Sequence, residues 1–206
     1  MQFQFDPPVS IQAIVERQQL AAASTANTKK SELLVIVVAS PIHRMSASVL
    51  KQASAIRETL STTAGGGSAP LGSALAAVGE NAIRIVLSHS DDNVPFYMEN
   101  SLVAGTPIVM MYALGRRILF SLDGRRSGEV ANCVAAGSIV GHLTRGCLEA
   151  LIAHVSNLLV SGKILSMTHG EDSDSSDYDE DSDDEAAAKK PFRIAVDPAM
   201  ITPSLS

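Results

Sequence analysis

Residues 33–39, LLVIVVA, form an unbroken apolar run that is rich in β-branched side chains. A strand buried on both faces of a sheet has this composition, because helices then cover the sheet on both sides. A helical pattern follows, in which apolar residues recur every three or four positions: Met45, Val49, Ala53, Ile56 and Leu60. The stretch predicts a central parallel strand followed by a helix packed against it.

Outward from this unit, the chain alternates between strand and helix patterns. Strands are predicted at residues 82–87, at 108–114 and 118–122 as a hairpin, and at 192–196. A long helix of small residues is predicted from Gly128 to Val160. This alternation indicates an α/β fold of the Rossmann-like kind: an open, mostly parallel sheet with helices on both faces.

The N-terminus carries two further signals. MQFQF (1–5) alternates polar and apolar residues, as a short edge strand does. Asp6, Pro7 and Pro8 then predict the start of a helix that runs to about Ala23. The predicted organisation is an N-terminal strand, helix and linker at 1–31, an α/β domain at 32–168, an acidic segment at 169–190, and a C-terminal strand and tail at 191–206.

Charge is concentrated in one place. The stretch from Glu171 to Glu185, EDSDSSDYDEDSDDE, holds ten of the 22 acidic residues. The rest of the chain has 16 basic and 12 acidic residues, so a mildly basic body carries an acidic arm. This segment cannot bury apolar surface and its charges repel one another, so we expect it to be disordered.

Several classes of protein are not expected. No stretch approaches the roughly 20 consecutive apolar residues of a membrane helix, and the N-terminus lacks the basic and apolar regions of a signal peptide. We therefore expect a nuclear or cytoplasmic protein that is not secreted. Cys133 and Cys147 would lie about 21 Å apart in the predicted helix, which predicts free thiols rather than a disulfide. No metal or cofactor is expected, because no zinc-ligand spacing and no P-loop, GxGxxG or GxSxG motif occurs.

Two polar loops follow the first two core strands. One carries Ser40, His43 and Arg44, and the other, SHSDDN at 88–93, carries His89 and Asp91. In an open parallel sheet, sites form beyond the carboxyl ends of the strands. If the two strands are neighbours, His43, His89 and Asp91 are candidates for general acid–base chemistry. His142 and His154 fall within the predicted long helix and are expected to be packed or surface residues.

Basic pairs flank the second strand of the hairpin: Arg116, Arg117, Arg125 and Arg126. They are candidate contacts for phosphates or for an acidic partner. No aromatic interleaving or dense basic stretch accompanies them, so solvated turn residues are the simpler interpretation and direct nucleic-acid binding is not expected. In the acidic segment, Ser176 and Ser182 each have an acidic residue three positions later, which acid-directed kinases favour, so both are candidate phosphorylation sites.

Three segments in order resemble one family. LLVIVVASP (33–41) is similar to the opening strand of the smaller von Willebrand A-type subunit of transcription factor TFIIH, NAIRIVLSHSDDNVPFYM (81–98) to its second strand, and GHLTRGCLEALIAHVSN (141–157) to the helix that follows. FRIAV (192–196) fits the next strand. The Asp-x-Ser-x-Ser pattern of metal-binding members is absent, since Ala39, Pro41 and His43 stand at those positions. The cysteine-rich zinc module and the last strands of that subunit are absent too.

The resemblance implies a scaffold subunit that binds a larger von Willebrand A partner in a nuclear complex serving transcription initiation and nucleotide excision repair. Our leading hypothesis is accordingly a non-catalytic interaction subunit of a multiprotein complex. Two alternatives stay open: an assembly factor or chaperone whose Glu171–Glu185 arm binds a basic client, and a small enzyme with a His/Asp site at the sheet edge.

Overall fold

The structure is a computed structural model. It describes the greater part of the chain, with gaps; the described residues are 5–6, 11–24, 32–40, 42, 44–62, 83–92, 107–122, 133–135, 137–166 and 191–201. The acidic segment lies outside them, as do His43, Arg125, Arg126, Ser176 and Ser182.

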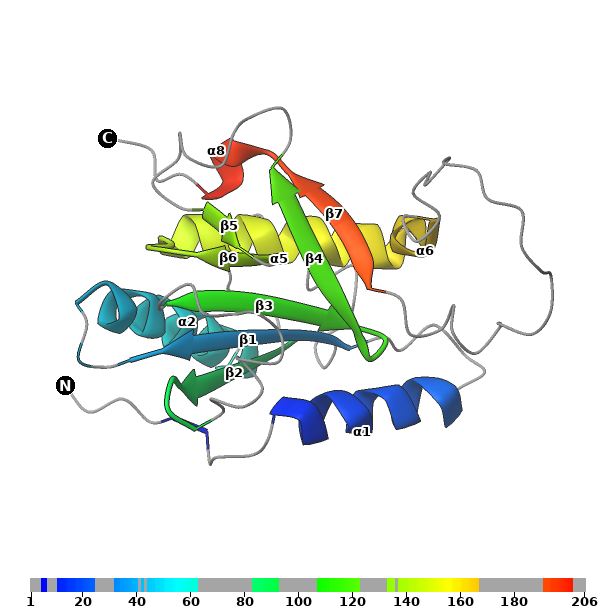
Figure 1. The fold of residues 1–206 in the computed structure, drawn as a ribbon, viewed down its shortest axis with the longest axis horizontal. Coiled ribbons are helices and arrows are strands. Elements are labelled where there is room, and N and C mark those ends of the chain that lie inside the picture. The colour runs from blue at the N-terminus through cyan, green and yellow to red at the C-terminus, as the bar shows by residue number, and fades with distance from the viewer. Residues whose placement is uncertain are drawn as a thin grey trace.

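The described elements are strands and helices, as Figure 1 shows. In chain order they are α1 (Ile11–Ser24), β1 (Leu33–Ala39), α2 (Arg44–Thr62), β2 (Ile83–His89), β3 (Ile108–Ala113), β4 (Arg116–Leu122), β5 (Cys133–Ala135), β6 (Ser138–Val140), α5 (Arg145–Val160), α6 (Lys163–Ser166), β7 (Phe192–Val196) and α8 (Pro198–Ile201).

The strands form one mixed sheet in the order β2-β1-β3-β4-β7. Strands β2, β1, β4 and β7 share one direction, while β3 runs the opposite way between β1 and β4. All seven residues of β1 are buried, because neighbouring strands and packed side chains surround it. The predicted α/β class and the buried central strand are confirmed, and β7 rejoins the sheet after the acidic segment by pairing with β4.

The sheet branches at the outer side of β3. Its carboxyl half pairs with the start of β4, from Ala113↔Arg116 to Met111↔Ile118. Its amino half pairs instead with β6, at Ile108↔Val140 and Val109↔Ile139. The amide of Phe120 in β4 donates a hydrogen bond to the carbonyl of Gly137, at the turn between β5 and β6. The short β5–β6 hairpin therefore fills the space where β4 diverges from β3.

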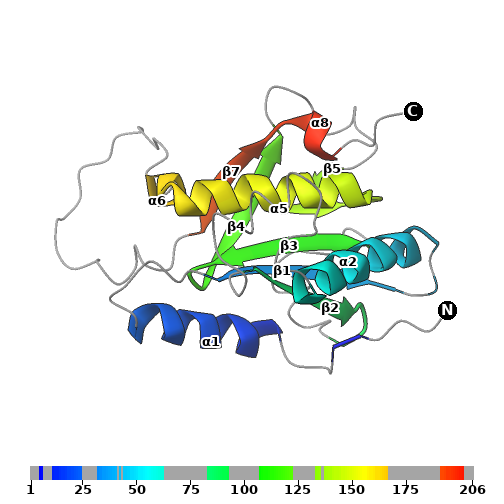
Figure 2. The same cartoon turned by 180° about the vertical axis from the view of Figure 1, so that it is seen from behind.

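Helices cover both faces of the sheet unequally. Helices α2 and α5 lie side by side on one face, as the view from behind shows (Figure 2), and enclose the larger core together with α6 and α8. On the other face, Ile11 and Ile14 of α1 pack against alternate residues of β1 and β3, among them Ile36 and Met110. The period-two alternation of strand side chains thus sends neighbouring residues into two different cores.

Two predictions are wrong. The predicted helix from Gly128 to Val160 begins only at Arg145; Cys133 lies in β5, so the helical spacing assumed between Cys133 and Cys147 does not apply. Gly137 and Gly141 interrupt the segment with φ angles of 71° and 126°, a region in which a helix cannot continue. Asp6 does not cap α1 either, because that helix begins at Ile11.

Candidate functional site

The carboxyl ends of β1 and β2 define the first candidate site. These strands pair in parallel with Ala39 opposite His89, and the amide of Ser90 donates a hydrogen bond to the carbonyl of Ala39 over 3.2 Å. The loops that follow the two strands therefore leave the sheet at the same edge. We call this edge, which also includes the first turns of α2, the carboxyl edge.

His89 and Asp91 lie together at the carboxyl edge. The backbone amide of Asp91 donates a hydrogen bond to His89 Nδ1 over 3.2 Å, and an Asp91 carboxylate oxygen lies 3.8 Å from the same nitrogen. A neutral imidazole that accepts at Nδ1 carries its proton on Nε2. Nε2 is thus the nitrogen that acid–base chemistry would use here. His43, the third predicted member of this group, lies outside the described residues.

The N-terminal segment packs onto this edge. The ring of Phe5 meets that of His89 edge to face, with 5.1 Å between centroids. The carboxylate of Asp6 accepts two hydrogen bonds from Arg57 on α2, at 3.1 and 2.9 Å, and one from the amide of Leu87 at 2.7 Å. The amide of Asp6 donates to the carbonyl of Leu87 at 3.0 Å. We call residues 5–6 the N-terminal strap. Sequence reasoning missed these contacts. The edge strand predicted at MQFQF falls outside the described residues except for Phe5, which lies in no strand.

A serine–histidine contact joins α2 to the turn before α5. The hydroxyl of Ser48 lies 3.0 Å from His142 Nε2, and both side chains are partly buried. The prediction that His142 lies in a helix is wrong: it follows Gly141, and Thr144 caps α5 by accepting a hydrogen bond from the amide of Cys147. A hydroxyl beside an imidazole can act as a nucleophile and its base, and the same contact also serves to hold two elements together.

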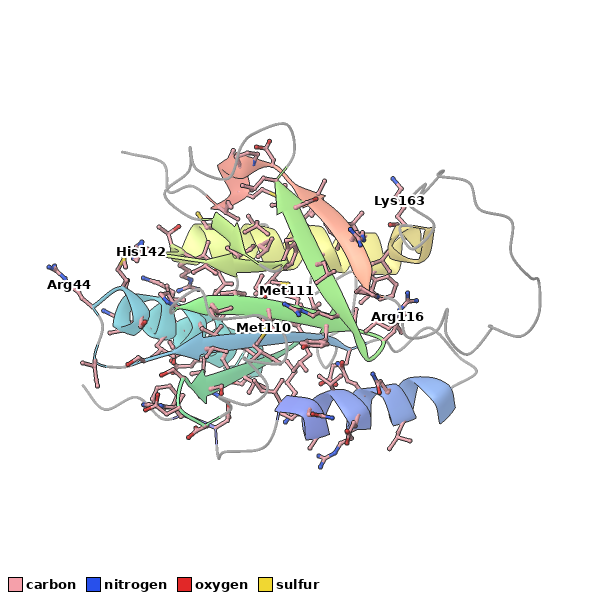
Figure 3. The ribbon with its side chains drawn as sticks, in the orientation of Figure 1. Arg44, Met110, Met111, Arg116, His142 and Lys163 are labelled. Carbon is pink, nitrogen blue, oxygen red and sulfur yellow. The ribbon has the colours of Figure 1, made fainter. Side chains whose placement is uncertain are left out.

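Exposed apolar side chains stand at the carboxyl edge. Ile42 is 88% exposed and Met45 is 55% exposed, and Arg44 between them is exposed as well. Figure 3 shows Arg44 and His142 at this end of the molecule and Arg116 at the opposite end. Methionine and arginine are both enriched at protein interfaces, so these exposed side chains are candidate contacts for a partner.

The arginines of the hairpin are held by the fold. The guanidinium of Arg116 lies 4.1 Å from the centre of the Phe192 ring, a cation–π contact to β7. Arg117 donates a hydrogen bond to the hydroxyl of Ser138 at 2.9 Å, where the sheet branches, and stands opposite Tyr112 in the β3–β4 ladder. Partial burial lowers the pKa of both arginines. Arg125 and Arg126, the second predicted pair, lie outside the described residues.

A charged pair braces the start of α5 against α2. Arg145 donates to the carboxylate of Glu149 at 2.7 Å and to the hydroxyl of Thr59 at 3.3 Å, and the side chain of Glu149 is only 5% exposed. Within the described ranges, no three His, Cys, Asp or Glu side chains gather in a way that could hold a metal ion. The part of the chain that the structure describes contains no helix long and apolar enough to cross a membrane.

Comparison with known proteins gives no relative. No protein-family model matches the chain, and neither the curated proteins nor the solved structures contain a match.

Proposed function

We propose that this protein is a non-catalytic interaction subunit of a larger assembly and that the carboxyl edge is the surface its partner covers. The observation that carries the proposal is the exposure of Ile42 and Met45 on either side of Arg44. Burying two such side chains on binding stabilises a complex by a few kcal/mol, at about 25 cal/mol per Å² of apolar area. Methionine and arginine are also enriched at protein interfaces.

The packing of His89 supports the same proposal. Its ring is covered on one side by Phe5 and its Nδ1 accepts a backbone hydrogen bond. The hairpin arginines likewise contact Phe192 and Ser138. In this structure these polar groups contact other residues of the same chain, whereas Ile42 and Met45 are exposed.

The partner to test first follows from the resemblance to the smaller von Willebrand A-type subunit of TFIIH. The experiment is affinity purification of the tagged full-length chain from its own cells, with mass spectrometry of the recovered proteins. We expect a stable nuclear complex. Recovery of the larger von Willebrand A subunit and the TFIIH helicases would support the family, and recovery of a different complex would keep the interaction role and discard the family.

If no protein is recovered, the proposal fails, and an enzyme acting through His89 or through the contact between Ser48 and His142 becomes the better hypothesis.

The acidic arm gives the second candidate function, an assembly factor that binds a basic client. Ten acidic residues between Glu171 and Glu185 are the observation in its favour. Deleting 171–185 should then abolish recovery of the partner and leave thermal unfolding unchanged. For an interaction subunit that binds through the carboxyl edge, the same deletion should leave recovery of the partner nearly unchanged.

A further inference from the structure

The side of β2 that faces away from β1 can accept a further segment of chain. Among the described strands, β2 pairs with β1 alone, so its other side forms one border of the sheet. Alternate residues of a strand direct their backbone groups to opposite sides. The amide and the carbonyl of Leu87 bond to Asp6, so both point away from β1 toward this border. An unpaired strand edge is a ready template for an added extended segment.

The N-terminal strap shows which chemistry this edge accepts. Backbone pairing is supplied by the amide of Asp6, which donates to the carbonyl of Leu87. The carboxylate of Asp6 accepts hydrogen bonds from the amide of Leu87 and from the guanidinium of Arg57. These contacts favour an acidic side chain as short as that of aspartate. The preceding residue places an aromatic ring against His89. Each contact depends on one feature of a sequence in which an aromatic residue precedes an aspartate.

The contacts of the N-terminal strap are weak enough for another segment to displace it. The side chains of Asp6 and Arg57 are 38% and 33% exposed, so water reaches the ion pair and weakens it relative to a buried one. Phe5 is only partly buried against the main core. A segment of the same chemistry on another protein can therefore compete for these contacts.

We propose that the β2 edge, with Leu87, His89 and Arg57, is a binding site for an extended segment of a partner protein in which an aromatic residue precedes an aspartate, and that Phe5–Asp6 occupies this site in cis. The inference rests on the proposed interaction role and names the segment that the partner contributes. The backbone hydrogen bond to Leu87 contributes affinity, and the guanidinium and the imidazole supply specificity.

The test measures binding of a labelled peptide of residues 1–8, MQFQFDPP, to the full chain by fluorescence anisotropy. In the variant Phe5→Ala/Asp6→Ala the cis strap cannot compete, and we expect saturable binding. Wild type should bind at least about tenfold more weakly, because a tethered segment competes at an effective concentration on the order of millimolar. Adding Arg57→Met to the strap variant should weaken binding by about tenfold or more, since hydrogen bonds to a charged group are lost.

Two controls define the outcome. Lys51→Met removes an exposed cation from the same helix and should leave peptide affinity unchanged. A peptide with asparagine in place of its aspartate should bind the strap variant about as weakly as the wild-type peptide binds the variant that also carries Arg57→Met. The proposal is overturned if the folded strap variant shows no saturable binding, or if both peptides bind it equally well.

A second variant covers the case in which the double variant does not fold. Asp6→Asn keeps the size of the side chain, and amide exchange at Leu87 reads the strap directly, because this amide donates to Asp6. Hydrogen exchange of the Leu87 amide should be faster in Asp6→Asn than in wild type and should slow again when the wild-type peptide is added. If the peptide does not slow this exchange, the proposal is wrong. Failure of either peptide test leaves affinity purification of the partner unaffected, so the two proposals can fail separately.

Discussion

Arginines lie at both ends of the sheet, but those at one end are packed against other side chains and the one at the other end is exposed. At the hairpin end, Arg116 lies over an aromatic ring and Arg117 bonds to the buried hydroxyl of Ser138. At the carboxyl edge, Arg44 is exposed beside Ile42 and Met45. The arginine pair that looks more like a binding motif in the sequence is therefore the one that holds the sheet together. Packing, rather than the presence of charge, separates a structural cation from one that can meet a partner.

The largest expected effect concerns how tightly the hairpin end is packed. Gly115 has a φ of 71°, and a Cβ there would lie 2.4 Å from Gln19 Cγ and 2.7 Å from the Gln19 backbone on α1. Gly115→Ala should lower the free energy of unfolding by about 3 kcal/mol or more, from backbone strain plus overpacking. Urea denaturation measures this loss.

Gly162 supplies the matched control for that substitution. Its φ is 70°, but a Cβ there would meet nothing within 4 Å. Gly162→Ala should cost only the strain of the left-handed conformation, about 1 kcal/mol. Equal losses for the two alanine variants would show that the hairpin does not press on α1 as described.

The next effect compares the two ends directly. Arg117→Met removes the donor that the buried hydroxyl of Ser138 uses at the branch of the sheet, and should cost about 1–3 kcal/mol. Arg44→Met, at an exposed position on the carboxyl edge, should change stability by less than about 0.5 kcal/mol. If denaturation midpoints fall equally in both variants, the distinction between structural and available cations is wrong.

A smaller effect appears at alkaline pH. Burial raises the pKa of Tyr112 above its ordinary value of 10.0, and the nearby charge of Arg117 acts in the opposite direction. Because the folded state then keeps its phenolic proton longer than the unfolded state, this contribution to stability is full below about pH 10 and is lost as pH rises further. Stability should thus fall less steeply above about pH 10 in Tyr112→Phe than in wild type. Parallel curves of unfolding free energy against pH would contradict this.

The sequence predicted those elements whose pattern was strong. The buried strand at 33–39, the helix behind it and the hairpin around Gly115 all appear close to their predicted bounds. The strand at Phe192 appears as well, and it joins the sheet. In each case a local run or period of apolar residues, with the β-branched content of the strands, indicates the type of element.

The failures have physical reasons. Between Cys133 and Val140 the residues are too small to show a clear period, so only the left-handed glycines and the β-branched Val134, Ile139 and Val140 could have revealed the short hairpin. The position of β3 between β1 and β4, and the contacts of Asp6 with Arg57 and Leu87, join residues far apart in the chain. No local pattern encodes such contacts.

The most direct test of the carboxyl edge as the partner surface is quantitative recovery of binding partners from cell extract. Tagged wild type would be compared with Ile42→Glu/Met45→Glu and with Leu20→Glu, which places a charge on an exposed apolar residue of α1 that is 72% exposed. We predict that the edge variant loses most of the recovered complex, while Leu20→Glu and wild type recover it equally and all three unfold at the same temperature. Equal recovery by the folded edge variant and wild type would show that the partner does not bind at the carboxyl edge.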